Sequence, residues 1–428
     1  MDHLHAALKL DPTAPIPNAI ARAPDSLDAA MRVAIAADRR RRLMMAAAAL
    51  SALVICVASA SDFSPRLMLL VFVAAALGVV LQRSRFGFSA AFRAVIERRE
   101  ADGLRLHALM MVVTSLAFLP LLARGEFLGH AMSGFGTGLG VSLVCGALMF
   151  GVGMQLAGGC ASGTLFALGN GNLKHLGTGA GFILGSTLAA GQISFWRDLP
   201  EAPAIFVQDS LGLPLGLLVQ VGGLLLVAVV LSRFCRRPLW PAVAVPATWS
   251  ARVLHMPWPL LAGALGLAVL NILTLVVSGQ PWGETSAFAL WGSKLVSLTP
   301  WFDAQGWDYW RGNEGALGSS IFTDVASIMD IAIVLGAFGA ASVSGDFSLR
   351  LGRHPMIWLT ACAGGTLMGY GARIAGGCNI GAYFSAGSSG SVSAWLWLMI
   401  ALAGSEVGLY LRAKLRLDQI EAQADATC

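Results

Sequence analysis

A glycine-rich segment that carries one cysteine occurs twice in this chain. It reads GVGMQLAGGCASGTLFALG around Cys160 and returns 218 residues later as GYGARIAGGCNIGAYFSAG around Cys378. A thiol offers a weak hydrogen-bond donor and a polarisable sulfur. Two thiols at equivalent positions of an internal duplication could line one path for a soft, sulfur-bearing anion, although cysteine also serves as a small apolar residue in crowded turns.

The protonation state of the two thiols decides what chemistry they can do. A helix N-terminus favours the thiolate, but a thiolate would repel an incoming anion. Burial favours the neutral form. We therefore expect neutral thiols that donate S–H to the substrate and release it, rather than covalent nucleophiles, because conduction requires binding that is weak enough to reverse.

Further residues of the repeated segment belong to the same candidate path. Gln155 and Arg373 hold matching places five residues before the two cysteines. Because an arginine within a membrane span usually faces a cavity or a partner, we expect Arg373 to draw the anion inward. The alternative is that Arg373 caps carbonyl groups or extends to the membrane surface. The other candidates are the turn residues Gly158, Gly159, Gly163, Gly376, Gly377, Gly381 and Asn379.

Three more cysteines are secondary candidates. Cys145 and Cys362 precede the two motifs, and Cys56 lies in the first apolar run. Each could relay the substrate, but core packing is the simpler interpretation. Lys174 and His175 follow the first motif, and we interpret them as markers of membrane topology.

The composition predicts the elements that must position these residues. Apolar residues make up 56% of the chain, charged residues make up 12%, and the mean hydropathy is +0.69. A soluble domain carries about twice that share of charge, so we predict an all-α polytopic membrane protein. Ten spans are expected, at about 43–60, 67–82, 106–123, 138–157, 176–195, 212–232, 259–279, 325–343, 356–374 and 394–411.

The positive charge of the loops predicts the orientation. Arginine and lysine gather in 83–105, 233–256, 344–355 and the C-terminal tail, which the positive-inside rule places in the cytosol together with both termini. Five expected spans separate the two motifs, an odd number, so we predict an inverted repeat with its site at the repeat interface. The expected parts are a cytosolic arm (1–42), a first repeat (43–245), a second repeat (246–412) and a cytosolic tail (413–428).

Two kinds of non-spanning segment are also expected. Residues 161–171 and 379–390 follow the two cysteines and are too short and glycine-rich to span, so we predict short re-entrant helices there. The free N–H groups at the start of such a helix make an anion site. The loop 280–324 contains five tryptophans, and we expect it to form interfacial helices on the outer surface.

Other classes of function find little support. The net charge of +5 comes from a few loops and does not indicate nucleic-acid binding. The cysteines lack the spacing of a zinc site. The sequence GFGTGLG at Gly134–Gly140 precedes an apolar run, rather than linking a strand to a helix as a dinucleotide site would. We expect no cofactor, no metal and no nucleic-acid partner.

At its two Gly-Gly-Cys motifs the chain resembles the YeeE/YedE family of sulfur-transport membrane proteins. The resemblance covers most of residues 65–412. Besides the motifs, it includes FGFSAAFR from Phe86 to Arg93, the span Leu106–Ala123, the tripeptide Phe322-Thr323-Asp324 and the stretch Gly381–Ser391.

The resemblance implies uptake of thiosulfate or a related sulfur compound across a bacterial inner membrane, without catalysis. It also implies short helices that point into the core from both faces, and a direct contact of Cys160 and Cys378 with the anion. Only Cys56 and Cys145 are candidates for a further family cysteine. Some family members carry a fused sulfur-carrier domain. We expect no such domain in this chain, so besides the anion and membrane lipid its expected partner is a separate cytosolic sulfur carrier.

Two other interpretations stay open. The chain could be a membrane sulfurtransferase in which one cysteine takes sulfane sulfur as a persulfide, which requires a base close to the thiol. It could also be a non-catalytic membrane subunit of a sulfur or selenium complex. Uptake of labelled thiosulfate would separate these interpretations from a permease.

Overall fold

The computed structural model describes residues 24–61, 64–235, 257–300, 303–352 and 354–426. The chain divides into two units, residues 1–45 and 46–428. In the first unit the described residues form the start of helix α1 (Pro24–Ser61). Three sequence-based expectations lie outside the described residues: the first half of the cytosolic arm, the loop 236–256 with the expected repeat boundary, and Trp301.

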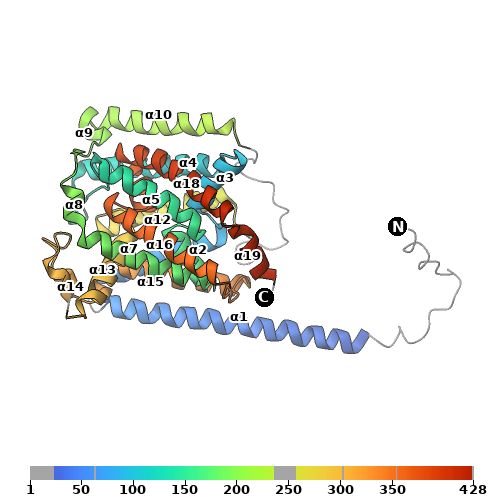
Figure 1. Cartoon of the computed structure of the whole chain (residues 1–428). Helices are drawn as coiled ribbons and strands as arrows, with labels where there is room; N and C mark the ends of the chain where they lie inside the picture. Colours follow the sequence, from blue (N-terminus) through green and yellow to red (C-terminus); the bar gives the residue numbers. More distant parts are fainter. Residues whose placement is uncertain (1–23, 62–63, 236–256, 301–302, 353, 427–428) are drawn as a thin grey trace. The chain divides into compact units, whose positions relative to one another are not determined.

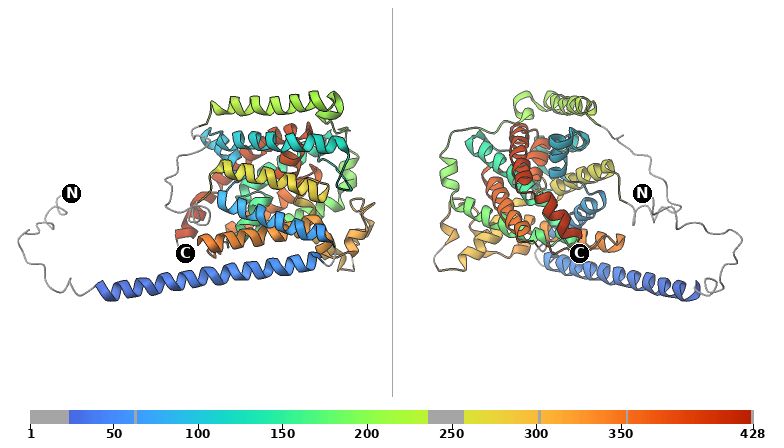
Figure 2. Two further views of the ribbon diagram at one scale, coloured as in Figure 1. Left: turned by 180° about the vertical axis from the view of Figure 1, so that it is seen from behind. Right: turned by 45° about the vertical axis from the view of Figure 1, so that its right-hand side comes forward.

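Long helices build the second unit, as the composition predicts. Figures 1 and 2 show them side by side in one bundle. Their bounds are α2 (Pro65–Ser84), α4 (Asp102–Arg124), α5 (Val141–Ala157), α7 (Lys174–Gly191), α10 (Leu213–Ser232), α12 (Leu260–Ser278), α15 (Val325–Ser344), α16 (Pro355–Ile374) and α18 (Ser393–Lys414).

Short elements connect or follow the long helices. The short helices are α3 (Phe88–Arg98), α6 (Ala161–Gly169), α8 (Ile193–Arg197), α9 (Val207–Leu211), α13 (Thr285–Ser297), α14 (Gly315–Gly318), α17 (Ala386–Ser388) and α19 (Leu417–Ala426). Two 3₁₀ turns, η1 (Ala304–Gly306) and η2 (Ile321–Thr323), and a π-helical segment, η3 (Asn379–Ser385), complete the helical elements described. Two short antiparallel strand pairs are also present. Strand β1 (Glu126–Phe127) pairs with β2 (His130–Ala131), and β3 (Leu139–Gly140) pairs with β4 (Glu201–Ala202).

The helices confirm an all-α polytopic membrane protein. Among the described residues, seven helical segments are long and apolar enough to cross a membrane: Pro65–Arg98, Asp102–Arg124, Val141–Gly169, Leu213–Ser232, Leu260–Ser278, Val325–Ser344 and Ser393–Lys414. The other three expected spans, 43–60, 176–195 and 356–374, fall largely within helices α1, α7 and α16. That these three segments cross the membrane stays a prediction.

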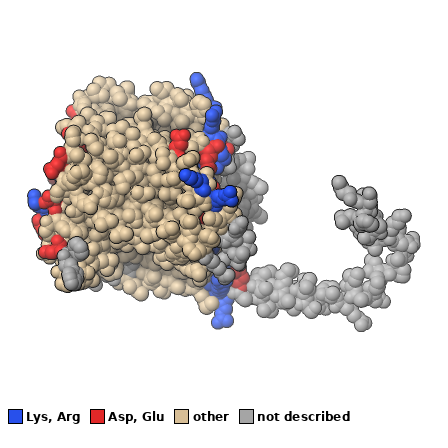
Figure 3. Space-filling view, in the orientation of Figure 1, with Lys and Arg blue, Asp and Glu red and all other residues tan. Residues whose placement is uncertain are grey.

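The distribution of charge fits a chain embedded in lipid. On the face shown in Figure 3, the Lys, Arg, Asp and Glu side chains gather at two opposite ends, and a broad uncharged surface lies between them. Leucine and valine side chains are exposed along α10, including Leu218, Leu226 and Val229. Exposed apolar side chains of this kind are stable in hydrocarbon, whereas charged ones are costly there.

The expectation of surface helices is wrong for the first part of the loop 280–324. Trp282 is fully buried, and α13 packs against α7, α15 and α16. The reason is that this part of the loop satisfies its polar groups inside the protein. The Trp282 N–H donates to Asn271 Oδ1 at 2.8 Å, and the Ser385 hydroxyl donates to the Trp282 carbonyl at 2.8 Å. Buried backbone without such partners would be costly.

Candidate anion path

The first motif is a break between two helices. Helix α5 ends at Ala157, and Gly158 follows in the left-handed region with φ of 74°. Glycine adopts this conformation without the penalty that a Cβ atom brings. Cys160 then occupies the N-cap of α6, where its carbonyl accepts from the Thr164 N–H at 2.8 Å. The expected short helix after Cys160 is therefore present.

The second motif repeats this arrangement with a tighter turn. After α16 ends, Gly376 has φ of 77° and Gly377 has φ of 150°. A Cβ atom at Gly377 would lie 2.8 Å from the Ala382 nitrogen, which leaves no room for a side chain. Cys378 then caps η3. The expected short helix is again present, here as π-helix followed by α17.

Both thiols lie at the start of their short helices and are almost inaccessible, with 1% of each residue exposed. The Cys160 sulfur is 3.4 Å from the Ser162 hydroxyl oxygen, and the Ile380 N–H donates to the Cys378 sulfur at 3.4 Å. The two cysteines belong to the same buried apolar cluster. The geometry thus brings together two residues that are far apart in the sequence.

Asn379 connects the second motif to the helix that leads into the first. Its Nδ2 donates to the Met154 sulfur at 3.7 Å, and the residue is fully buried. Its Oδ1 has no hydrogen-bond partner among the described residues. A buried amide oxygen that is left free can accept a bond from a ligand or water.

Gly163 keeps side-chain volume away from the Cys160 thiol, and Gly381 leaves open space beside the second motif. A Cβ atom at Gly163 would lie 3.5 Å from the Cys160 sulfur. At Gly381 the nearest atom to a Cβ would be on the Phe135 ring, at 4.0 Å. By contrast, Gly158 and Gly376 are exposed. Each motif therefore runs from an exposed glycine to a buried thiol.

Arg373 is held at the end of α16. It donates to the Tyr309 hydroxyl and, at 3.1 Å, to the Thr285 hydroxyl, and its guanidinium carbon lies 5.3 Å from the centre of the Tyr309 ring. Its Nε is buried without a partner among the described residues. Arg373 thus ties α16 to α13 and to the loop after it while it retains a free donor.

Gln155 occupies the matching place near the first motif but makes different contacts. Its side-chain amide donates to the Ser89 carbonyl at 3.4 Å, and its own carbonyl accepts from Arg412 Nη1 at 3.2 Å. The residue is 3% exposed. These contacts link α5 to α3 and α18.

The secondary thiols lie in packed surroundings. Cys145 is half-buried beside Ala189 and Ile193. The Cys362 carbonyl accepts from the Thr366 hydroxyl at 2.9 Å, and a Cβ atom at Gly181 would lie 2.1 Å from that carbonyl oxygen. These contacts fit the packing interpretation. Cys56 lies on α1, and its side chain is outside the described part of the chain.

Three buried polar residues near the motifs were not among the sequence-based candidates for the path. His175 is 4% exposed, and a Cβ atom at Gly159 would lie 3.3 Å from its Cε1. Glu284 and Asp330 are fully buried, and their carboxylate oxygens have no hydrogen-bond partner in the part of the chain that the structure describes. Glu284 is the N-cap of α13 and directly precedes Thr285, whose hydroxyl accepts from Arg373. The sequence signal that could have identified Asp330 is an acidic residue inside the expected span 325–343.

A family model described as Sulphur transport matches residues 83–407, which is most of the chain. The chain belongs to the Sulphur transport family. This confirms the resemblance that the Gly-Gly-Cys motifs indicate. Two curated proteins are similar to this chain over nearly their whole length.

Two relatives of the Sulphur transport protein described here carry the name thiosulfate transporter TsuA. The one from Spirochaeta thermophila is 28% identical over 342 residues, which cover 77% of this chain and 93% of the relative. The one from Escherichia coli is 24% identical over 351 residues, which cover 77% of this chain and 90% of the relative. The probable transporter YedE of Escherichia coli is 28% identical over 151 residues, 35% of this chain and 37% of the relative.

Proposed function

We propose that this protein is an inner-membrane permease that imports thiosulfate or a related sulfur-containing anion past Cys160 and Cys378. The observation that carries the proposal is the placement of two buried thiols, each at the first turn of a short helix that follows a glycine break. The names of the TsuA relatives agree with this substrate class.

The chemistry of the motifs suits a soft dianion. Neutral S–H groups are weak donors, and the N–H groups of a helix start donate to an anion without carrying a full charge. Such bonds bind an anion without trapping it. We propose that the path is lined by the motif residues Cys160, Cys378, Gly158, Gly159, Gly163, Gly376, Gly377, Gly381 and Asn379, and that Arg373 and Gln155 flank it.

The proposal includes an orientation and a partner. Both termini face the cytosol, the repeats 43–245 and 246–412 are inverted, and lipid surrounds the bundle. A separate cytosolic sulfur carrier would receive the imported sulfur. These statements rest on the positive-inside rule and on the resemblance to the family.

Uptake of radiolabelled thiosulfate into proteoliposomes tests the proposal. A hydrogen bond to a charged ligand contributes about 1.5–3 kcal/mol, so Cys160→Ala and Cys378→Ala should each lower uptake about tenfold or more. Cys145→Ala and Cys362→Ala are matched controls that should retain uptake. If both motif variants transport like the unmodified protein, a thiol-lined path is excluded.

A membrane sulfurtransferase is the second candidate, because the His175 ring lies against Gly159 and its Nδ1 has no hydrogen-bond partner among the described residues. In that reaction the Cys160 thiol would lose its proton to the imidazole. The thiolate would then bond to the sulfane sulfur of thiosulfate, the S–S bond would break, and sulfite would leave. A persulfide on Cys160 with stoichiometric sulfite, found by mass spectrometry, would favour the enzyme over the permease.

A further inference from the structure

Two cations lie beside the exposed glycine of the first motif. A Cβ atom at Gly158 would be 3.4 Å from Lys174 Nζ and 3.7 Å from Arg412 Nη1. Lys174 begins α7 and Arg412 lies in the last turn of α18. Their side chains are 17% and 3% exposed. A pair of cations therefore lies two residues from Cys160, at the end of the path that we predict to face the cytosol.

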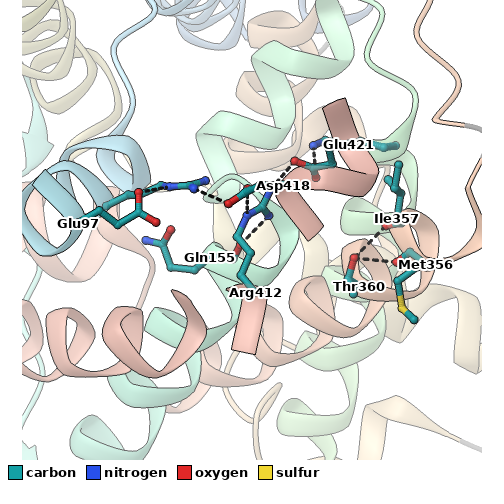
Figure 4. Close-up of polar contacts among 10 residues, drawn as sticks. Glu97, Gln155, Met356, Ile357, Thr360, Arg412, Asp418 and Glu421 are labelled. Carbon is teal, nitrogen blue, oxygen red and sulfur yellow. Dashed lines mark hydrogen bonds and ion pairs between the residues drawn. The ribbon is translucent and has the colours of Figure 1, made fainter. Parts of the chain in front are cut away.

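Carboxylates of α19 occupy these cations. Arg412 Nε donates to Asp418 Oδ1 at 2.7 Å, and Lys174 Nζ donates to Glu421 Oε1 at 3.0 Å. Arg412 also donates to the other oxygen of Glu421. Figure 4 shows the Asp418 and Glu421 side chains directed toward Arg412. Their oxygens stand where the oxygens of a small dianion would accept from the same donors.

The Arg412 guanidinium is held in place independently of α19. Its Nη1 donates to the Gln155 carbonyl at 3.2 Å, which fixes it to the end of α5. A buried guanidinium that loses its counter-charge is strongly destabilising. The position therefore requires an anion next to Arg412, either a carboxylate of α19 or a ligand.

Helix α19 is attached by contacts that can be exchanged. It has ten residues, and Asp418 has 54% of its side chain exposed. Asp418 also accepts from Arg93 at 2.9 Å, and Leu417 is buried at its start. Asp418 and Glu421 are partly exposed, so both carboxylates can return to water when another anion takes their place at Arg412. An anion that arrives at Arg412 could therefore replace these carboxylates at a small energetic cost.

We propose that Lys174 and Arg412 form a second anion site at the inner end of the path, and that Asp418 and Glu421 close it until the transported anion displaces α19. The ligand class is a small dianion with oxygen acceptors, such as thiosulfate or sulfate. This inference rests on the proposed transport function, since it adds an exit site and a gate to that path.

The double variant Asp418→Asn/Glu421→Gln tests the competition in the full chain. It removes both competing charges and keeps the side-chain sizes. Thiosulfate binding, measured by calorimetry on purified protein, should become about threefold to tenfold tighter. The control Asp198→Asn/Asp209→Asn removes the same charge from exposed positions between the expected spans 176–195 and 212–232 and should leave affinity unchanged. Equal or weaker binding by the first variant would overturn the gate.

A second measurement uses the unmodified protein. Arg416 is exposed at the junction of α18 and α19, so trypsin should release the tail faster once α19 is displaced. Saturating thiosulfate should raise the cleavage rate at Arg416, read by mass spectrometry, and Lys174→Gln should weaken that response. A cleavage rate that thiosulfate leaves unchanged or lowers, in protein that transports thiosulfate, rejects the gate and leaves the transport proposal standing. Protein that takes up no thiosulfate rejects the transport proposal itself.

Discussion

Gly146 on α5 lies against Gly371 on α16 so closely that a Cβ atom at Gly146 would be 2.6 Å from the Gly371 carbonyl oxygen. Gly153 and Gly364 meet in the same way, at 2.5 Å. In the register of the duplication, Gly364 corresponds to Gly146 and Gly371 corresponds to Gly153. A two-fold axis between the copies would map the contact of Gly146 with Gly371 onto the contact of Gly364 with Gly153. The contact therefore supports the inverted repeat that the sequence predicts.

The first prediction concerns this crossing. Gly371→Ala would place a methyl group against the backbone of α5, where only glycine allows so close an approach. We expect a loss of about 1–3 kcal/mol in stability, typical of overpacking, seen as a lower melting temperature in detergent. Gly222→Ala on α10 is the matched control, since nothing lies within 4 Å of a Cβ atom there. Equal melting temperatures for the two variants would contradict the close crossing.

The second prediction separates two roles of Arg373. If its charge draws the anion inward, Arg373→Ala should raise the KM for thiosulfate more than Arg373→Lys does, because lysine keeps the charge. If it only anchors the loop after α13, Tyr309→Phe, which removes the hydroxyl that accepts from Arg373, should reproduce the effect of Arg373→Ala. Uptake kinetics of the three variants distinguish the two outcomes. Unimpaired uptake by all three would remove Arg373 from the path.

The third prediction concerns Glu284, which is buried and directly precedes Thr285, whose hydroxyl accepts from Arg373. An ionised carboxylate there would repel an anion, and a buried carboxylate without a partner is costly. Glu284→Gln should therefore keep the uptake rate and should not lower the melting temperature. Glu284→Lys should destabilise the fold, because it also buries a charge without a partner. Loss of uptake in a well-folded Glu284→Gln variant would instead show that transport needs an ionisable group at this position.

The fourth prediction is a pH dependence at α19. Burial raises the pKa of Asp418, but hydrogen bonds from Arg412 and Arg93 outweigh that effect and hold the pKa below its usual value. A carboxylate with a lowered pKa stabilises the docked helix above its unfolded pKa, and this contribution is lost as the pH falls through the lowered value. Lys174 and Glu421 are the other charged groups of this cluster.

Hydrogen exchange of residues 417–426 measures this effect. After correction for the intrinsic exchange rate, the protection of these amides should fall as the pH drops through the lowered pKa of Asp418. The variant Asp418→Asn should show low protection with a weaker pH dependence. Protection that stays constant in the unmodified chain, or that falls equally in the variant, would exclude Asp418 as the titrating group.

Local properties of the chain were predicted well from the sequence. All ten expected spans fall largely in helices, because apolar composition and length are properties of each segment alone. The breaks at Gly158 and Gly376 were predicted for a similar reason, since glycine marks positions where the backbone adopts positive φ. The short helices after Cys160 and Cys378 follow from these breaks.

Contacts between distant segments could not be predicted in this way. The burial of Trp282 depends on Asn271 and Ser385, and the environment of Arg412 depends on the tail after it and on Gln155 far before it. His175 was interpreted as a topology marker, yet its ring packs against Gly159. In each case the side chain's own sequence neighbourhood contains no information about the partner.

The sequence by itself therefore determined the membrane class, the duplication and the identity of the two thiols, because hydropathy, repetition and residue type are readable along one chain. The tertiary structure alone decided that both thiols lie in one buried cluster, and that α19 covers the cations beside the first motif. It also buries the carboxylates of Glu284 and Asp330 without a hydrogen-bond partner among the residues that the structure describes. These relationships arise from close packing of helices at glycines, which brings segments hundreds of residues apart within hydrogen-bonding distance.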